Sequence, residues 1–320
     1  MLGCDPVRGL GAALVLAWWS TADAVPVDPP PVHLRVRPDR PRLGDLALLE
    51  VSLPPEDRFD SAGARDRGGL GEVRAFGCRY VLAPTAGHPS AWHGAIAVPA
   101  DASAGPHTLQ VRTPSLETPI PVRIELEPRT VDVTRLRVAP RFTNEEKSPA
   151  LVARLKAEAT RMRRMWSRPP TTPLAEGAFV RPAPGRVTGR YGTERRFNQT
   201  VQSVHYGLDI GAPIGTPVKA ALPGRVAMSE DRWAAGRTVF IDHGAGLFTA
   251  YFHLARRRVR PGETIRAGQI IGDVGKSGRV TGPHLHFGLA VRCMREQSSE
   301  ARGMYVDPEP WLDGRWGTLP

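Results

Sequence analysis

The chain has 320 residues, enough for about two domains, and 33 of them are glycine and 32 are proline. So much glycine and proline excludes a bundle of long helices, and a hydrophobic content of 41% excludes wholesale disorder. Lys and Arg outnumber Asp and Glu by 43 to 32, and the net charge of +11 indicates an anionic partner: nucleic acid, lipid head groups or an acidic cell envelope.

Residues 1–24 have the pattern of a secretory signal peptide. The apolar run from Leu10 to Trp19 is too short to span a bilayer, Arg8 precedes it, and Ala22 and Ala24 supply the small residues of a cleavage site. A buried N-terminal helix is the alternative. Cleavage after Ala24 would leave an exported chain with no transmembrane segment, in the periplasm, the cell wall or the extracellular space. There an anionic cell-envelope surface is the expected partner, and nucleic acid is not.

Two cysteines, Cys78 and Cys293, remain after this cleavage. Cysteines of an exported protein can pair, but these two lie far apart in sequence, in two separate predicted domains. The expectation is therefore two unpaired, partly buried thiols, with a disulfide bond between the domains as the alternative. Neither cysteine has a Cys or His neighbour at the spacing of a metal site.

Residues 25–128 predict a small β-sandwich of the immunoglobulin-like type, which begins with a proline-rich leader. Short stretches of alternating or apolar character are separated by turns rich in Pro, Gly, Asp and Ser. These stretches are VHLRVRP, ALLEVSL, CRYVL, GAIAV, HTLQVR and PIPVRIEL.

Residues 129–178 predict a linker with a basic helix. Ser148 and Pro149 are suited to a helix cap and first turn, and Arg168-Pro169-Pro170 marks the end. Apolar residues recur at helical spacing, with Arg and Lys at many other positions. The apolar residues are Leu151, Leu155, Ala159, Met162 and Trp166. The favoured interpretation is a linker helix that packs this stripe on the next domain, and the alternative is a helix that contacts the envelope.

Residues 179–320 predict a second all-β domain, with dense glycines and short β-branched stretches, and contain five of the nine histidines. His205 and Asp209 are four positions apart, and Gly207 between them argues against a helix. His284 and His286 are two positions apart, so on a strand both imidazoles leave the same face. Imidazole nitrogens and a carboxylate oxygen suit Zn²⁺, and catalytic zinc sites keep three protein ligands and one open position.

Residues 179–312 resemble the lysostaphin-type (LytM-domain) zinc metallopeptidases, which cut peptidoglycan cross-links. The resemblance rests on H-x-x-x-D at His205 and Asp209, on H-x-H at His284 and His286, and on His253 in YFHL between them. It continues through RPGETIRAGQIIGDVGKSGRVTGPHLHF and VDPEPWL. It implies that residues 179–320 form an antiparallel β-rich LytM-type peptidase domain.

The resemblance also implies roles for these residues. His205, Asp209 and His286 would bind one Zn²⁺ per chain, and His253 and His284 would be catalytic. His243, in an Asp-His-Gly turn, is expected to support the fold instead. Because all five site residues lie after position 178, residues 169–320 alone are expected to fold and to cleave small peptides.

The sequence therefore predicts an exported zinc metalloendopeptidase that hydrolyses the peptide cross-links of peptidoglycan with metal-activated water. The chain has no H-E-x-x-H motif, so two imidazoles would do the acid–base work. One alternative is a non-catalytic LytM-type regulator that binds the wall and activates an amidase. Such regulators typically lack some of the zinc-site residues, whereas this chain has all five site residues, the three ligands and the two catalytic histidines. A second alternative is a wall-binding module that acts through its basic surface.

Overall fold

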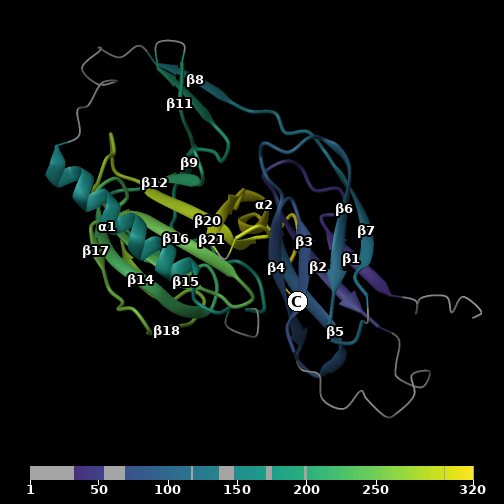
Figure 1. The fold of residues 1–320 in the computed structure, drawn as a ribbon. Coiled ribbons are helices and arrows are strands. Elements are labelled where there is room, and N and C mark those ends of the chain that lie inside the picture. Colours follow the sequence, from purple (N-terminus) through teal and green to yellow (C-terminus); the bar gives the residue numbers. More distant parts are fainter. Residues whose placement is uncertain are drawn as a thin grey trace, which may run out of the picture.

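The computed structural model describes residues 32–53, 69–116, 118–136, 148–170, 175–197, 200–298 and 300–319. These residues form twenty-one strands and two helices (Figure 1). The predicted all-β class is thereby confirmed. No helix among these residues is long and apolar enough to cross a bilayer. The predicted signal peptide, residues 1–24, lies outside the described residues.

Seven strands in the N-terminal half form two antiparallel sheets that share β4. One sheet has the order β1-β2-β5-β4, and the other continues from β4 through β3 and β6 to β7. The first half of β4 pairs with β3 and its second half with β5, so this strand turns from one sheet into the other. The large buried side chains of Tyr80, Leu82 and Trp92 fill the core between them. The immunoglobulin-like assignment itself stays a prediction. The strands are β1 (His33–Arg37), β2 (Leu46–Ser52), β3 (Gly71–Ala75), β4 (Cys78–Thr85), β5 (His88–Ala97), β6 (Gly105–Arg112) and β7 (Ile120–Leu126).

An antiparallel sheet centred on β20 forms the C-terminal half. β20 is a central strand, since β16 pairs with one edge while β12 and β21 pair with the other, and its residues are buried along almost its whole length. The order on the β16 side is β20-β16-β15-β14-β18, and β9 lies beyond β12. The strands are β9 (Arg186–Gly189), β12 (Leu208–Gly211), β14 (Gly224–Arg232), β15 (Gly236–Asp242), β16 (Leu247–Leu254), β18 (Thr264–Ile265), β20 (Leu285–Arg295) and β21 (Ala301–Val306).

Two small three-stranded sheets complete the C-terminal half. In the first, β8 from the predicted linker pairs with β10, which pairs with β11; β8 and β11 lie above β9 and β12 in Figure 1. In the second, β19 lies between β13 and β17. The strands are β8 (Val133–Leu136), β10 (Glu194–Phe197), β11 (Thr200–Val204), β13 (Pro217–Lys219), β17 (Arg256–Arg257) and β19 (Ile270–Asp273).

Helix α1 (Pro149–Trp166) lies across the sheet that contains β14 and β15 (Figure 1), and the Ser148 side chain caps it by accepting from the Leu151 N–H. Met165 and Trp166 are buried in an apolar cluster with Phe240 and Phe248 of the sheet. The favoured interpretation of a packed linker helix therefore agrees with the structure, but the packing is concentrated in the last turn. Ala159, in the middle of the predicted stripe, is exposed. A short second helix, α2 (Glu309–Leu312), buries Trp311.

The expectation of two unpaired thiols is wrong, because Cys78 and Cys293 form a disulfide bond with their Cα atoms 5.2 Å apart. The end of β20 pairs with the start of β4, in the register Met294 with Arg79 and Arg295 with Cys78. The sheet of the C-terminal half thus continues into the N-terminal half, and the two cysteines meet where the strands join. No local pattern in the sequence reveals such a long-range strand pair.

Candidate metal centre

Neighbouring strands bring three of the five predicted site residues into one place, and the segments just before β20 and just after β11 bring the other two. Asp209 on β12 is paired with His286 on β20, and on the other side of β20 Phe252 is paired with His286. His253 directly follows Phe252 on β16, and His284 directly precedes β20. His205 follows the last residue of β11. The site is therefore assembled from segments that are far apart in sequence and adjacent in the sheet.

Three potential ligand atoms converge, one each from His205, Asp209 and His286. Nε2 of His205 lies 2.9 Å from Oδ1 of Asp209 and 3.0 Å from Nδ1 of His286, and this Nδ1 lies 2.9 Å from the same Oδ1. A tetrahedral Zn²⁺ with bonds of about 2.0–2.2 Å separates its ligand atoms by roughly 3.3–3.6 Å. The three atoms are close to that spacing, so small outward movements of the side chains would admit the ion.

The hydrogen bond of the other His205 nitrogen supports a cation rather than a hydrogen-bonded cluster. Nδ1 of His205 lies 2.8 Å from the carbonyl oxygen of Arg190, and since a carbonyl only accepts, this nitrogen carries the hydrogen. In the neutral imidazole Nε2 then presents a lone pair to Asp209 and His286. Without a metal ion, at most one hydrogen, on Nδ1 of His286, is available for the three contacts among these atoms. With Nδ1 of His286 deprotonated, all three atoms present lone pairs to one point, which fits a metal ion, and the backbone of Arg190 orients the His205 ligand.

Two further imidazoles flank this triad. Nε2 of His284 lies 3.6 Å from Oδ1 of Asp209, and the His284 and His253 rings have centroids 4.9 Å apart. Nδ1 of His284 donates to the carbonyl of Gly282 at 2.9 Å, and Nδ1 of His253 donates to the carbonyl of Ser277 at 3.0 Å. In the neutral form of either ring Nε2 is therefore the basic nitrogen, which can accept a proton from a substrate or a water.

Burial and contact set the charge states of the site. Burial alone would raise the pKa of Asp209, but the adjacent imidazoles of His205 and His286 outweigh it and hold this pKa well below its usual range. Burial lowers the pKa of His286, and it lowers the pKa of His253 to about 4. At neutral pH the structure thus holds Asp209 as a carboxylate beside neutral His286 and His253, and a carboxylate and a neutral imidazole are the forms that bind a metal ion.

Close backbone approach explains why two positions beside the site are glycine; the sequence pattern used Gly207 only as an argument against a helix and gave no role to Gly189. A Cβ at Gly207 would lie 2.6 Å from Nε2 of His286, and one at Gly189 would lie 2.8 Å from Oδ2 of Asp209. No sequence pattern indicated a role for Phe252, whose ring stacks on His286 with centroids 5.0 Å apart and planes at 6°. The central glycine of H-Y-G-L-D was the one visible signal, since any side chain there would displace a ligand.

His243 lies outside this group and is part of the core. Its Nδ1 donates to the carbonyl of Pro223 at 2.7 Å, and its Nε2 lies 2.7 Å from the hydroxyl of Thr249. The side chain is almost fully buried, as expected for a residue that supports the fold.

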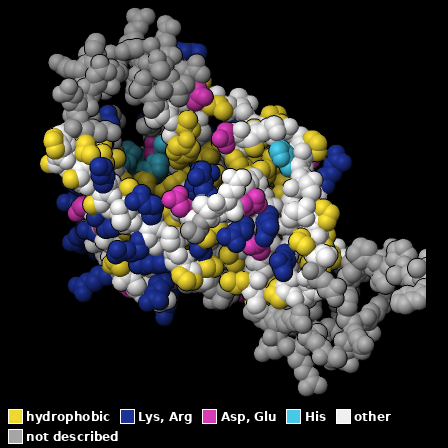
Figure 2. Space-filling view, in the orientation of Figure 1, with side chains coloured by type: hydrophobic (Ala, Val, Ile, Leu, Met, Phe, Trp, Pro, Cys, Tyr) yellow, Lys and Arg dark blue, Asp and Glu magenta, His cyan; other side chains and the backbone are white. Residues whose placement is uncertain are grey.

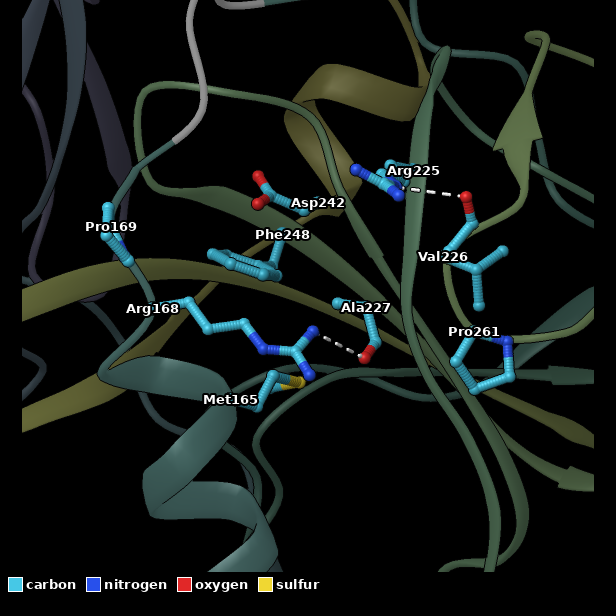
Figure 3. A pocket seen from close by; sticks show the side chains of 10 residues that line it. Met165, Arg168, Pro169, Arg225, Val226, Ala227, Asp242, Phe248 and Pro261 are labelled. Atoms are coloured by element: carbon cyan, nitrogen blue, oxygen red, sulfur yellow. Dashed lines mark hydrogen bonds between the residues drawn. The ribbon is translucent and has the colours of Figure 1, made fainter.

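The surface around the site is hollowed. Figure 2 shows a group of histidine side chains at the bottom of a depression in this face. A separate cavity of about 380 Å³ lies where the end of α1 meets β14 and β15 (Figure 3). Arg168 and Arg225 at its edge each donate to a backbone carbonyl, of Ala227 and of Gly262. None of the five predicted site residues lines this cavity, so it does not bear on their chemistry.

Comparison with known proteins identifies similar chains. The sequence profile of peptidase family M23 matches residues 203–308. The peptidoglycan DD-endopeptidase ShyC of Vibrio cholerae is 43% identical over 107 residues, which are 33% of this chain and 25% of ShyC. Lysostaphin of Staphylococcus simulans is 34% identical over 133 residues, covering 36% of this chain and 27% of lysostaphin. The similar segment thus spans about a quarter of each of these two relatives.

One solved structure resembles the chain over most of its length. It is a crystal structure from Pseudomonas aeruginosa assigned to peptidase M23, which covers 85% of this chain and 95% of its own, with a TM-score of 0.59. The two sequences are only 23% identical, so this similarity concerns the fold alone.

Proposed function

We propose, from the premise that residues 203–308 form a domain of peptidase family M23, whose profile they match, that the protein is an exported zinc endopeptidase that hydrolyses the peptide cross-links of peptidoglycan. The observation that carries the proposal is the convergence of the ligand atoms of His205, Asp209 and His286 within 3.0 Å of one another, beside two further imidazoles. Relatives such as ShyC, a peptidoglycan DD-endopeptidase, support the substrate class.

In this proposal the three residues of the triad would hold one Zn²⁺. Zinc would supply a Lewis acid that lowers the pKa of water toward ~7 and polarises the scissile carbonyl. The carbonyl of Arg190 keeps Nε2 of His205 directed at the centre, and the pairing of Asp209 with His286 fixes the other two ligand atoms. The protein's contribution is thus a rigid set of ligand atoms with a carboxylate among them.

His253 and His284 would handle the protons. Each has its Nδ1–H bound to a backbone carbonyl, so each offers Nε2 as the base. One of these nitrogens can take a proton from the attacking water and later deliver it to the departing amine nitrogen, which needs a proton to leave. The low pKa of His253 keeps its ring in the basic form at neutral pH.

Export follows from the substrate in this proposal, since peptidoglycan lies outside the cytoplasmic membrane. The disulfide bond between Cys78 and Cys293 supports it independently, because such bonds persist in oxidising compartments. The net charge of +11 supports binding to an anionic cell-envelope surface. The complete set of five site residues argues against a non-catalytic regulator.

The test is product analysis with purified peptidoglycan and the chain from residue 25 onward. The products should be peptides with a newly released amino group from a cut cross-link, identified by mass spectrometry. A strong chelator should stop their release and added Zn²⁺ should restore it. The Asp209→Ala protein serves as the control for contaminating hydrolases. Cross-link cleavage by metal-free protein would contradict the proposal, and stimulation of an added amidase without any cleavage would favour the regulator.

A further inference from the structure

Arg129, in the segment between β7 and β8, holds three parts of the chain together. Its guanidinium donates to the carbonyl of Leu43 at 2.6 Å, to Oδ1 of Asp45 at 2.6 Å and to Oδ2 of Asp307 at 2.8 Å. Leu43 and Asp45 lie before β2 in the N-terminal half, and Asp307 follows β21 in the C-terminal half. Both carboxylates are buried and accept from Arg129, and Oδ2 of Asp45 also lies 3.7 Å from Nε of Arg42.

The same guanidinium lies over the ring of Tyr191, 5.4 Å from its centroid. Gly44 closes on this ring from the N-terminal half, since a Cβ at Gly44 would lie 2.6 Å from Cε1 of Tyr191. On the other side the Tyr191 hydroxyl donates to the carbonyl of Tyr305 on β21 at 2.9 Å. Tyr191 is therefore held between the two halves of the molecule, in a position that Arg129 helps to define.

Tyr191 belongs to loop 190–193, and this loop holds His205. The carbonyl of Arg190 accepts from Nδ1 of His205 at 2.8 Å. The N–H of Gly192 donates to the carbonyl of His205 at 2.8 Å, and the N–H of His205 donates to the carbonyl of Thr193 at 3.0 Å. Three hydrogen bonds from one short loop thus fix both the backbone and the ring of a candidate ligand.

The segment that contains Arg129 also braces the far end of this loop. The Glu194 N–H donates to the carbonyl of Asp132 at 2.9 Å, and β8 then pairs in parallel with β10, which directly follows the loop. β10 in turn pairs with β11, whose last residue precedes His205. Loop 190–193 is anchored through Tyr191 at one end and through β8 at the other, and both anchors come from the segment that begins at Arg129.

We propose that Arg129 is a positioning residue for the candidate metal centre: through Tyr191 and β8 it fixes loop 190–193, which directs Nε2 of His205 at the ligand point. This inference rests on the proposed function. Groups that hydrogen-bond to metal ligands typically contribute 10–100-fold to metal affinity. Arg129 acts through one further contact, so its loss should weaken zinc binding by ~10-fold, at the lower end of that range.

The test measures zinc affinity by competition with a chromophoric chelator, in the full chain from residue 25 onward. Arg129→Met should bind Zn²⁺ ~10-fold more weakly than the unmodified protein, and Arg129→Lys should lie between them, because it keeps the charge but not the three-way hydrogen bonding. The matched control is Arg37→Met, which removes an equivalent 2.6 Å bond from Arg37 to Glu50 inside the N-terminal sheet. It should lower thermal stability and leave zinc affinity unchanged.

Unchanged zinc affinity in Arg129→Met, or an equal loss in Arg37→Met, would overturn the inference and leave Arg129 a purely structural residue. Where Arg129→Met alone fails to fold, the triple variant Arg129→Met, Asp45→Asn, Asp307→Asn removes the uncompensated buried charges and carries the same expectation. If the unmodified protein itself binds no Zn²⁺, the proposed function fails. Equal zinc affinities of the unmodified protein and Arg129→Met would instead overturn only the role of Arg129.

Discussion

His253 lies in the left-handed region of backbone conformation, with φ of 63°, as do only two other non-glycine residues in the described part of the chain. Such a conformation costs on the order of 1–3 kcal/mol and persists only where the surroundings enforce it. Here the His253 N–H donates to the carbonyl of Ala235 at 2.9 Å, and the ring is held by Ser277. The strained backbone turns the imidazole toward His284, which supports a role in the reaction rather than in packing.

Ligands and proton-transfer residues should separate in single variants. His286→Ala or Asp209→Ala removes a ligand atom, so both zinc content and hydrolysis should be lost. His284→Ala or His253→Ala leaves three ligands, so zinc should stay near one per chain while turnover falls by ~10²–10⁴-fold. Zinc content and rate are to be measured on the same preparations. Loss of zinc in His284→Ala together with its retention in His286→Ala would reverse the two assignments.

His243 should make folding stability depend on pH. Burial lowers its pKa in the folded state from 6.5 to about 4, so between these values the unfolded chain binds more protons than the folded one. The contribution of neutral His243 to the free energy of unfolding is fully present above pH 6.5. It is lost as the pH falls toward 4, and the total loss is roughly 3 kcal/mol.

The comparison is between zinc-free unmodified protein and zinc-free His243→Gln, unfolded in denaturant across this pH range. The unmodified protein should lose more of its free energy of unfolding on acidification than the variant loses. Parallel pH profiles would show that His243 is not buried in the neutral form.

At the scale of elements, short sequence patterns predicted those features that depend on neighbouring residues, such as the start of a helix or the face of a strand. The alternation in His284-Leu285-His286 placed both imidazoles on one face at the start of β20, and Ser148-Pro149 located the start of α1. The sequence did not predict that β8 joins β10, or that β20 continues into β4. Both pairings join strands far apart in sequence, and backbone hydrogen bonds between distant strands impose no periodicity on either one.

The disulfide bond at the junction of β4 and β20 should contribute to stability without touching the site. Both cysteines are buried, and their bond closes a loop of more than two hundred residues. Replacing both with alanine should lower the free energy of unfolding by ~2–5 kcal/mol and leave zinc content unchanged. Denaturant unfolding and metal analysis of the double variant test this. Loss of zinc would show that the junction of β4 and β20 affects the geometry of the metal site. An unchanged free energy of unfolding would show that the strand pairing holds this junction together without the disulfide bond.

At the scale of the whole molecule, the residues assigned to a linker are part of the structure that surrounds the site. Buried Glu158 of α1 accepts from the N–H of Trp233 at 2.9 Å, in the turn that leads to Ala235 and thus to His253. Trp166 packs its ring against Phe248, with centroids 4.8 Å apart. With β8 and Arg129, these contacts support both sides of the histidine group.

A chain shortened to residues 169–320 should therefore be impaired, although the sequence alone suggested that it would suffice. It retains all five site residues but lacks β8, α1, Arg129 and the Cys78 partner of Cys293. Its thermal unfolding should occur well below that of residues 32–320, and its zinc affinity should be weaker. Equal unfolding temperatures and equal zinc affinities in the two chains would restore the simpler division into independent domains.

In the proposed mechanism one zinc ion, held by His205, Asp209 and His286, is required for cleavage of peptidoglycan cross-links. The most direct measurement is a titration of Zn²⁺ into metal-free protein while peptide release from purified peptidoglycan is followed. The rate should rise linearly and stop rising at one Zn²⁺ per chain, and Asp209→Ala protein should show no such rise. Cleavage before any zinc is added, or full cleavage by Asp209→Ala, would contradict the account.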